Sequence, residues 1–139
     1  MPDAGATRGF YVQPGGNFNS IFIGTDFTKF QRLSLPPGNY IANASAVLAS
    51  QDTNFHQVDC VFMIGGNIAS EVASGTIGGN FGNFISLPLT LGFKLSNPED
   101  LVLACRADAL DVVSTQGSPI TAIRVNRLTI QPGFSGDEP

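Results

Sequence analysis

The sequence predicts an all-β fold, an antiparallel β-sandwich, from three observations. About ten short β-type segments follow one another, and turn residues close each of them. The segments carry almost no charge inside them. No stretch between them has the length or the 3.6-residue period of a helix. The predicted strands span 9–13, 20–24, 28–35, 38–50, 56–64, 67–73, 83–95, 100–107, 111–115 and 120–131.

Composition limits the partners of this chain. Its 139 residues suit one domain with a real core. Charged residues make up only 13%, about half the usual fraction. Such a β-domain is either covered by copies of itself or exposes a neutral polar binding face. The net charge of −4 with scattered basic residues argues against nucleic acid, and no apolar run is long enough for membrane insertion.

The first 27 residues are rich in aromatic side chains, and two interpretations stay open for them. The segment 1–27 forms either edge strands or an arm that reaches a neighbouring subunit. Large aromatic residues are typical interface anchors. The candidate interface residues are Phe10, Tyr11, Phe18, Phe22 and Phe27. Because 28–131 already contains enough strands for a sandwich, the arm is not expected to be needed for folding.

The next elements are predicted from turns and alternation. Pro37 and Gly38 suit the central positions of a type II turn. Strand 38–50 then has a mostly small inward side, which a bulky facing sheet must fill. Gly65-Gly66 predicts a two-residue hairpin, so that 67–73 folds back beside 56–64. The two strands 56–64 and 100–107 carry Cys60 and Cys105.

The C-terminal half is predicted in the same way. The glycine-rich stretch 75–82 is expected to be an exposed loop. Pro88 cannot donate to a ladder, so it is expected at a sheet edge or a bulge. The last strand, 120–131, alternates cleanly only if a bulge lies near 126–127. Residues 132–139 are expected to be a tail.

The chain resembles small bacterial and phage jelly-roll domains, which are similar to the C1q and tumour-necrosis-factor group. The residues that carry the likeness are Leu35-Pro36-Pro37-Gly38-Asn39-Tyr40 before a long small-residue strand, the two Cys-bearing strands, and the closing Thr121-Ala122-Ile123-Arg124-Val125. The likeness covers about 28–131 and implies a jelly roll of about 8–10 strands that assembles as a homotrimer. It leaves the N-terminal arm 1–27 uncovered and carries no ligand residue across.

No catalytic, cofactor-binding or metal-binding residues are predicted. His56 is the only histidine, and it is expected to be a polar residue at the start of a strand rather than part of a triad or metal site. Asp108-Ala109-Leu110-Asp111 is expected to be a solvated turn, with calcium binding as the alternative. For Cys60 and Cys105 we favour free core thiols; the alternative is a disulfide formed in an oxidising compartment.

The sequence therefore predicts a non-enzymatic structural protein. The favoured role is a trimeric virion-surface protein of the capsid-decorating or fibre type, whose partners are its own copies and a larger capsid shell. It would be found on the virion or outside the cell, and no signal peptide is visible. The alternative is a carbohydrate-binding or adhesion module that binds glycans through Asn80, Phe81, Asn83 and Phe84.

Overall fold

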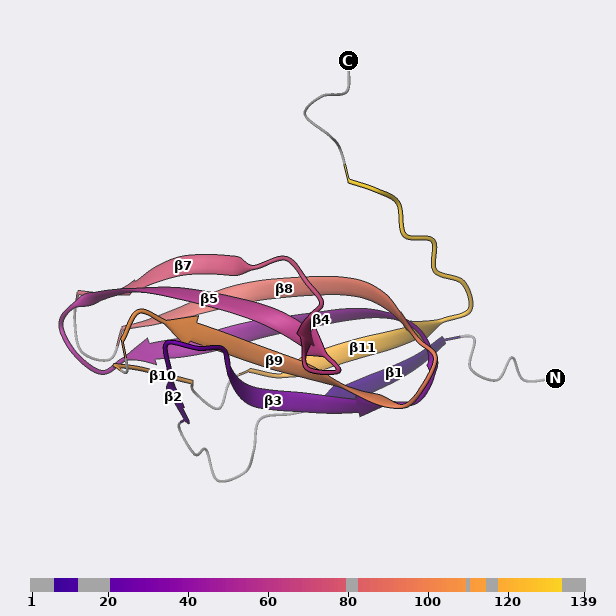
Figure 1. Ribbon diagram of the computed structural model, residues 1–139, viewed down its shortest axis with the longest axis horizontal. Coiled ribbons are helices and arrows are strands. Elements are labelled where there is room, and N and C mark those ends of the chain that lie inside the picture. Colours follow the sequence, from indigo (N-terminus) through magenta and orange to yellow (C-terminus); the bar gives the residue numbers. More distant parts are fainter. Residues whose placement is uncertain (1–6, 13–20, 80–82, 110, 115–117, 134–139) are drawn as a thin grey trace, which may run out of the picture.

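Two antiparallel β-sheets packed face to face form the body of the computed structural model (Figure 1). The structure describes residues 7–12, 21–79, 83–109, 111–114 and 118–133. The all-β sandwich predicted from the sequence is confirmed, since every regular element of the described residues is a strand. None of these residues lies in a helix that could span a membrane. The strands are β1 (Thr7–Val12), β2 (Ile21–Ile23), β3 (Thr28–Leu35), β4 (Gly38–Ser50), β5 (Phe55–Ile64), β6 (Asn67–Ile68), β7 (Ala73–Gly78), β8 (Phe84–Leu95), β9 (Glu99–Ala107), β10 (Val112–Ser114) and β11 (Ile120–Val125).

The long strand β4 organises the first sheet, which we call sheet A. One edge of β4 pairs along its length with β8. The other edge pairs first with β11 and then with β10, and these two strands carry β1 and β2 on their outer sides. Sheet B has the order β3-β9-β5, and β6 and β7 share the far edge of β5. The edge strands of sheet A therefore include β1, β2 and β8.

The core lies between the two sheets and matches the predicted strand alternation. Tyr40, Ala42, Ala44, Ala46 and Leu48 point inward from β4 and are buried. Because three of them are small, larger side chains from sheet B, such as Phe62 and Leu103, fill the space. The Tyr40 hydroxyl donates a hydrogen bond to the Pro36 carbonyl over 2.6 Å, and its ring stacks on Phe93 with centroids 5.4 Å apart.

The predicted turn at Pro37-Gly38 is wrong. Gly38 has a φ of 158° and begins β4, whereas a type II turn needs φ near +80° at that position. Residues 36–37 instead carry the chain from sheet B to sheet A. The hairpin at Gly65-Gly66 is confirmed, with φ values of 61° and 81°, which suit a type I′ turn.

Three strand predictions need correction. The single strand expected at 67–73 is two strands, β6 and β7, and β7 takes in part of the glycine-rich stretch expected to be a loop. The last strand ends at Val125 without a bulge at 126–127. Leu128 beyond it packs over Gly92, so its apolar character reflects packing against sheet A rather than strand pairing. A register shift occurs instead in β3, between Lys29 and Gln31.

Pro88 lies where its chemistry predicts. It sits in β8 opposite Ser45 of β4, and β8 is an edge strand with continuous register. Proline has no backbone N–H to donate. On an edge strand, the side that faces away from the sheet has no neighbouring strand that would need this hydrogen bond. The edge placement of Pro88 is therefore confirmed.

Cys60 and Cys105 form a disulfide, so the prediction of free thiols is wrong. The two residues are directly opposite each other on β5 and β9, with Cα atoms 4.1 Å apart and an S–S distance of 2.01 Å. Both are fully buried in the core. The register of β5 against β9 brings them together, and the linear sequence does not reveal that register.

Candidate functional site

The outer face of sheet A is free of charge across its whole centre. Alternation in the registers of β1, β2, β4, β8, β10 and β11 turns one set of side chains away from the core. We define this outer face by Gly9, Tyr11, Phe22, Ile41, Asn43, Ser45, Val47, Ala49, Phe84, Ser86, Pro88, Thr90, Gly92, Val113, Thr121 and Ile123. None of these side chains carries a charge; Lys94 lies beyond them at one end of β8.

Large apolar side chains stand exposed on this outer face. Ile41 and Ile123, which are neighbours across β4 and β11, are 40% and 41% exposed. Tyr11, Phe22 and Phe84 are more exposed still. An antiparallel sheet facing water normally alternates polar residues outward. A charge-depleted, aromatic-containing surface is instead typical of the core of a protein interface.

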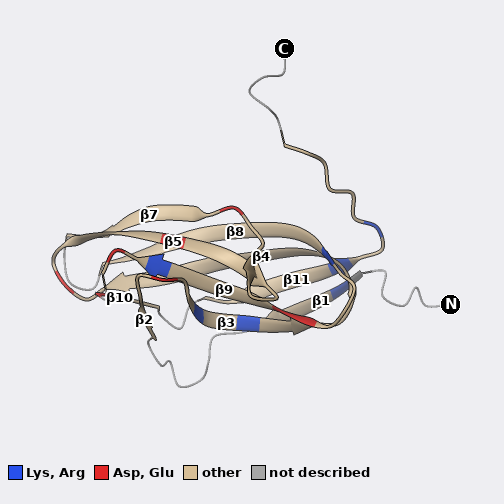
Figure 2. Cartoon of the chain, in the orientation of Figure 1, with Lys and Arg blue, Asp and Glu red and all other residues tan. Residues whose placement is uncertain are grey.

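Sheet B presents the opposite kind of surface. Its outer face carries the ion pairs Arg106–Asp59 at 3.0 Å and Arg32–Asp100 at 3.9 Å. Ser74 and Ser34 donate hydrogen bonds to the same two carboxylates. Coloured charged segments accordingly appear on β3 and β9, and β4 is tan through most of its length (Figure 2). The two outer faces of one sandwich thus differ in chemistry, and only that of sheet B resembles an ordinary solvated face.

A second feature is a buried histidine at the end of the sandwich where β2 and β10 lie. His56, near the start of β5, is 4% exposed. Its Nδ1 lies 2.7 Å from an oxygen of Asp108, and its Nε2 lies 2.8 Å from an oxygen of Asp52. A neutral imidazole has one N–H and could donate to only one of these carboxylates. The geometry therefore fits an imidazolium that donates to both.

The electrostatics of the three groups agree with this geometry. The hydrogen bond to Asp52, followed by that to Asp108, raises the pKa of His56 above 6.5, although burial opposes the shift. The hydrogen bond from His56 in turn lowers the pKa of Asp52 and of Asp108 below 3.8. Asp108 also accepts a hydrogen bond from the Gln57 amide over 3.2 Å.

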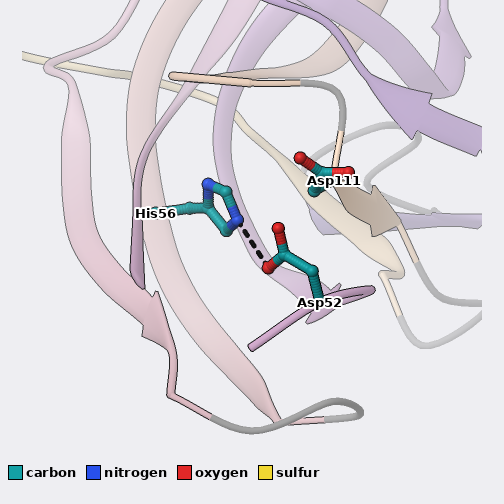
Figure 3. Close-up of side chains that lie close together, drawn as sticks. All are labelled: Asp52, His56 and Asp111. Atoms are coloured by element: carbon teal, nitrogen blue, oxygen red, sulfur yellow. Dashed lines mark hydrogen bonds and ion pairs between the residues drawn. The ribbon is translucent and has the colours of Figure 1, made fainter. Parts of the chain in front are cut away.

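Asp111 completes the cluster. A carboxylate oxygen of Asp52, a ring nitrogen of His56 and a carboxylate oxygen of Asp111 all lie within 4.8 Å of one another. The Asp52 carboxylate and the His56 ring face each other, and Asp111 approaches from a different segment (Figure 3). Within the described residues, these three side chains form a group whose ligand atoms are close enough together to hold a metal ion. His56 and the 108–111 segment lie far apart in the sequence, and neither was predicted to belong to such a cluster.

The predicted interface residues of 1–27 are spread over two edge strands and a connection. Tyr11 and Phe22 point outward on the outer face of sheet A, whereas Phe10 packs edge-on against Tyr40 at 5.9 Å. Phe27 lies under the Arg106 guanidinium at 4.6 Å. Phe18 lies outside the described residues.

The predicted glycan-binding residues are described only in part. Asn80 and Phe81 lie outside the described residues. Asn83 donates a side-chain hydrogen bond to the Gly78 carbonyl over 2.8 Å, and the Phe84 side chain is 73% exposed. Sequence reasoning missed Phe55, which is 71% exposed and whose ring packs against Gly79.

Comparison with known proteins identifies the fold. No family model and no curated protein sequence matches the chain. Among solved structures, the tumour necrosis factor Eiger of S. frugiperda aligns with a TM-score of 0.57 and 8% identity over 94% of this chain and 99% of that chain. The C-terminal domain of EclA, a sugar-binding protein, aligns at 0.44 with 14% identity over 86% and 81% of the two chains. Murine APRIL aligns at 0.46 with 9% identity over 84% and 98%. At 8% identity the likeness to Eiger concerns the fold alone, and it agrees with the jelly roll that the sequence resemblance implied.

Proposed function

We propose that this chain is a non-enzymatic structural protein that assembles as a homotrimer through the outer face of sheet A. The observation that carries the proposal is the contrast between the two outer faces of the sandwich. The outer face of sheet B carries two ion pairs between arginine and aspartate. The outer face of sheet A, as defined above, exposes Ile41, Ile123 and aromatic side chains and includes no charged residue. Burying such a surface costs little desolvation and removes apolar area from water.

The number three comes from the resemblance to the C1q and tumour-necrosis-factor group, which implies a three-fold arrangement. In a closed ring of three copies each subunit uses two different patches, so the outer face of one copy need not meet itself. The residues Tyr11 on β1 and Phe22 on β2 extend the outer face to two edges of sheet A. They supply the aromatic anchors that such interfaces favour.

A virion-surface location is the further part of this proposal. It rests on the resemblance of 28–131 to phage jelly-roll domains and on the low overall charge of 13%. The trimer would decorate or extend a capsid shell, with its neutral face buried between subunits. A catalytic role is not proposed, because carboxylates occupy both ring nitrogens of the single histidine.

The trimer is tested by light scattering on the wild-type chain and on Ile123→Arg. We expect the wild type to have three times the 14.6 kDa mass of one chain and Ile123→Arg to be monomeric at the same micromolar concentration. A buried charge without a partner destabilises an interface strongly. Ile68→Arg is the matched control, since Ile68 is 52% exposed on β6 of sheet B, outside this face.

Two results would contradict the trimer. One is a wild-type mass of a single chain at micromolar concentration. The other is an Ile123→Arg variant that stays trimeric, which would move the interface to another surface. Circular dichroism of both variants checks that the sandwich is intact.

A second function, glycan binding, is favoured by one observation. Phe55 and Phe84 expose their rings at 71% and 73%. Phe55 is paired with Gly78 at the end of β7, and Phe84, one of the predicted ligand residues, begins β8. Exposed aromatic faces beside the polar groups of Asn83 provide the surfaces that sugars use. A glycan array with the wild type, Phe84→Ala and Phe55→Ala tests this function. Loss of a bound glycan in both variants, with the mass unchanged, would support it, and an array without any binder would eliminate it.

A further inference from the structure

We propose that Asp52, His56 and Asp111 form a binding site for one divalent transition-metal ion, and that Zn²⁺ fits their chemistry best. The three residues come from different parts of the chain. Asp52 lies in the connection from β4 to β5, His56 lies in β5, and Asp111 directly precedes β10. An ion held by all three would fasten a strand of sheet B to connections that lead out of and into sheet A.

The distances suit a single ion. One ligand atom from each residue lies within 4.8 Å of the others, and the His56 Nε2 lies 2.8 Å from Asp52. Zinc bonds to histidine nitrogen and carboxylate oxygen measure about 2.0–2.2 Å, so ligand atoms on one zinc ion lie about 3–4 Å apart. Figure 3 shows the Asp52 carboxylate and the His56 ring directed toward each other. The Asp52 carboxylate also accepts hydrogen bonds from the backbone N–H and the side-chain amide of Asn54, over 3.1 and 3.2 Å, which hold it beside the His56 ring.

The orientation of the imidazole supports the proposal. The Asp108 carboxylate lies 2.7 Å from the His56 Nδ1. This contact fixes the orientation of the ring, so that Nε2 faces Asp52. Histidines that bind metals are commonly held in this way, with a carboxylate on the nitrogen opposite the metal. The ring is 4% exposed, so the surrounding strands restrict its alternatives. Zinc would take the place of the Nε2 proton, which leaves to solvent.

The local charge also calls for a cation. Three carboxylates, those of Asp52, Asp108 and Asp111, surround a single imidazole, so even the imidazolium leaves an excess of negative charge. None of the ion pairs between arginine or lysine and a carboxylate in the described residues involves these three aspartates. The Asp111 carboxylate accepts no hydrogen bond from the described part of the chain. Binding an ion would therefore cost the Asp111 carboxylate no hydrogen bond to the residues that the structure describes.

The ligand set favours zinc over calcium. Imidazole nitrogen suits Zn²⁺ and its transition-metal neighbours, whereas Ca²⁺ takes six to eight oxygen ligands. Three protein ligands leave one zinc position for water or another ligand. If 108–111 were a calcium-binding loop, Asp108 would be one of the calcium ligands. In the structure the Asp108 carboxylate instead contacts the His56 ring.

The site is tested by isothermal titration calorimetry of Zn²⁺ into the full chain without a polyhistidine tag. We expect one zinc ion per chain and at least tenfold weaker binding in Asp111→Asn. Asp26→Asn is the matched control, because Asp26 is an exposed carboxylate outside the cluster, and it should bind as the wild type does. Calcium chloride in place of zinc should give no comparable binding.

Nuclear magnetic resonance gives a readout that identifies the ligand atom. Because His56 is the only histidine, every imidazole signal belongs to it, and the different couplings of Nδ1 and Nε2 to the two ring C–H protons distinguish the two nitrogens. Zinc should shift the Nε2 resonance and leave the Nδ1 proton on its hydrogen bond to Asp108. The proposal is overturned if zinc does not bind, if Asp111→Asn binds zinc with wild-type affinity, or if the Nε2 resonance does not move.

Discussion

His56 is buried, and two carboxylates beside its ring favour the charged form of the imidazole. Burial alone disfavours an imidazolium. The hydrogen bonds to Asp52 and Asp108 outweigh it, because they raise the pKa of His56 and lower the pKa values of both aspartates. The three residues thereby link the connections after β4 and after β9 through one ring. The stability of this end of the sandwich should consequently depend on pH.

The metal-free chain should lose stability as the pH rises above neutrality. The folded-state pKa of His56 lies above 6.5, so its contribution is fully present below about 6.5 and is lost as the pH rises through the raised value. The contributions of Asp52 and Asp108 to stability depend on pH in the opposite direction, because the pKa values of both carboxyls are lowered in the folded state. These contributions are fully present above about pH 3.8 and are lost in stronger acid. Urea unfolding with a chelator should therefore show a maximum between these limits.

His56→Gln provides the comparison for this pH dependence. Glutamine keeps hydrogen-bonding capacity but does not titrate, so the decline of stability above pH 6.5 should flatten in this variant. An identical decline in wild type and variant would show that groups other than His56 cause it.

At this scale the sequence could not predict the cluster. His56 and Asp108 are 52 positions apart, and the Asp52 and His56 side chains meet because the chain turns between β4 and β5. The strands predicted at 38–50 and 56–64 imply a connection there, but residue type and spacing do not reveal the conformation that places Asp52 against the His56 ring. The exposure of Phe55 was equally hidden, since an aromatic residue at the start of a strand is as consistent with the core as with the surface.

The strands themselves could largely be predicted, because burial of one face imposes a period of two. In β4 the buried residues Tyr40, Ala42 and Leu48 share one side, and the structure keeps the predicted bounds of 38–50. The predicted strand bounds were wrong where a residue is apolar because of packing outside a strand rather than because of alternation within one. Leu128 is apolar because it covers Gly92, so extending the last strand beyond Val125 was wrong.

The disulfide between β5 and β9 should be a major source of stability. It closes a loop between residues 45 positions apart, and cross-links of this length stabilise proteins by about 2–4 kcal/mol through the unfolded state. Cys60→Ala/Cys105→Ala should therefore unfold at lower urea concentration by that free energy, with the fold retained. Adding a reductant to the unfolded wild type should give the same loss on refolding. If oxidised and reduced chains unfold at the same urea concentration, the cross-link is not formed in solution.

The whole molecule is a sandwich with two unlike outer faces, and the N-terminal segment adds to both its core and its neutral face. β1 contributes Tyr11 to the outer face of sheet A. β2 contributes Phe22 to the same face and Ile23, which is fully buried, to the core. In the described part of 1–27, β1 and β2 are strands of sheet A. Their contributions to folding and to the neutral face can be distinguished by experiment.

Removing residues 1–12 should weaken assembly more than folding. This deletion takes away β1, whose inward Phe10 is only partly buried against Tyr40, together with the exposed Tyr11. Ile23→Ala in the full chain should do the reverse, because truncating a buried isoleucine costs about 2–5 kcal/mol while leaving the outer face unchanged. Urea unfolding and light scattering on both variants separate the two effects. If the shortened chain no longer unfolds cooperatively, β1 is required for folding. If the proposed trimer of the shortened chain is as stable as that of the full chain, β1 is not part of the interface.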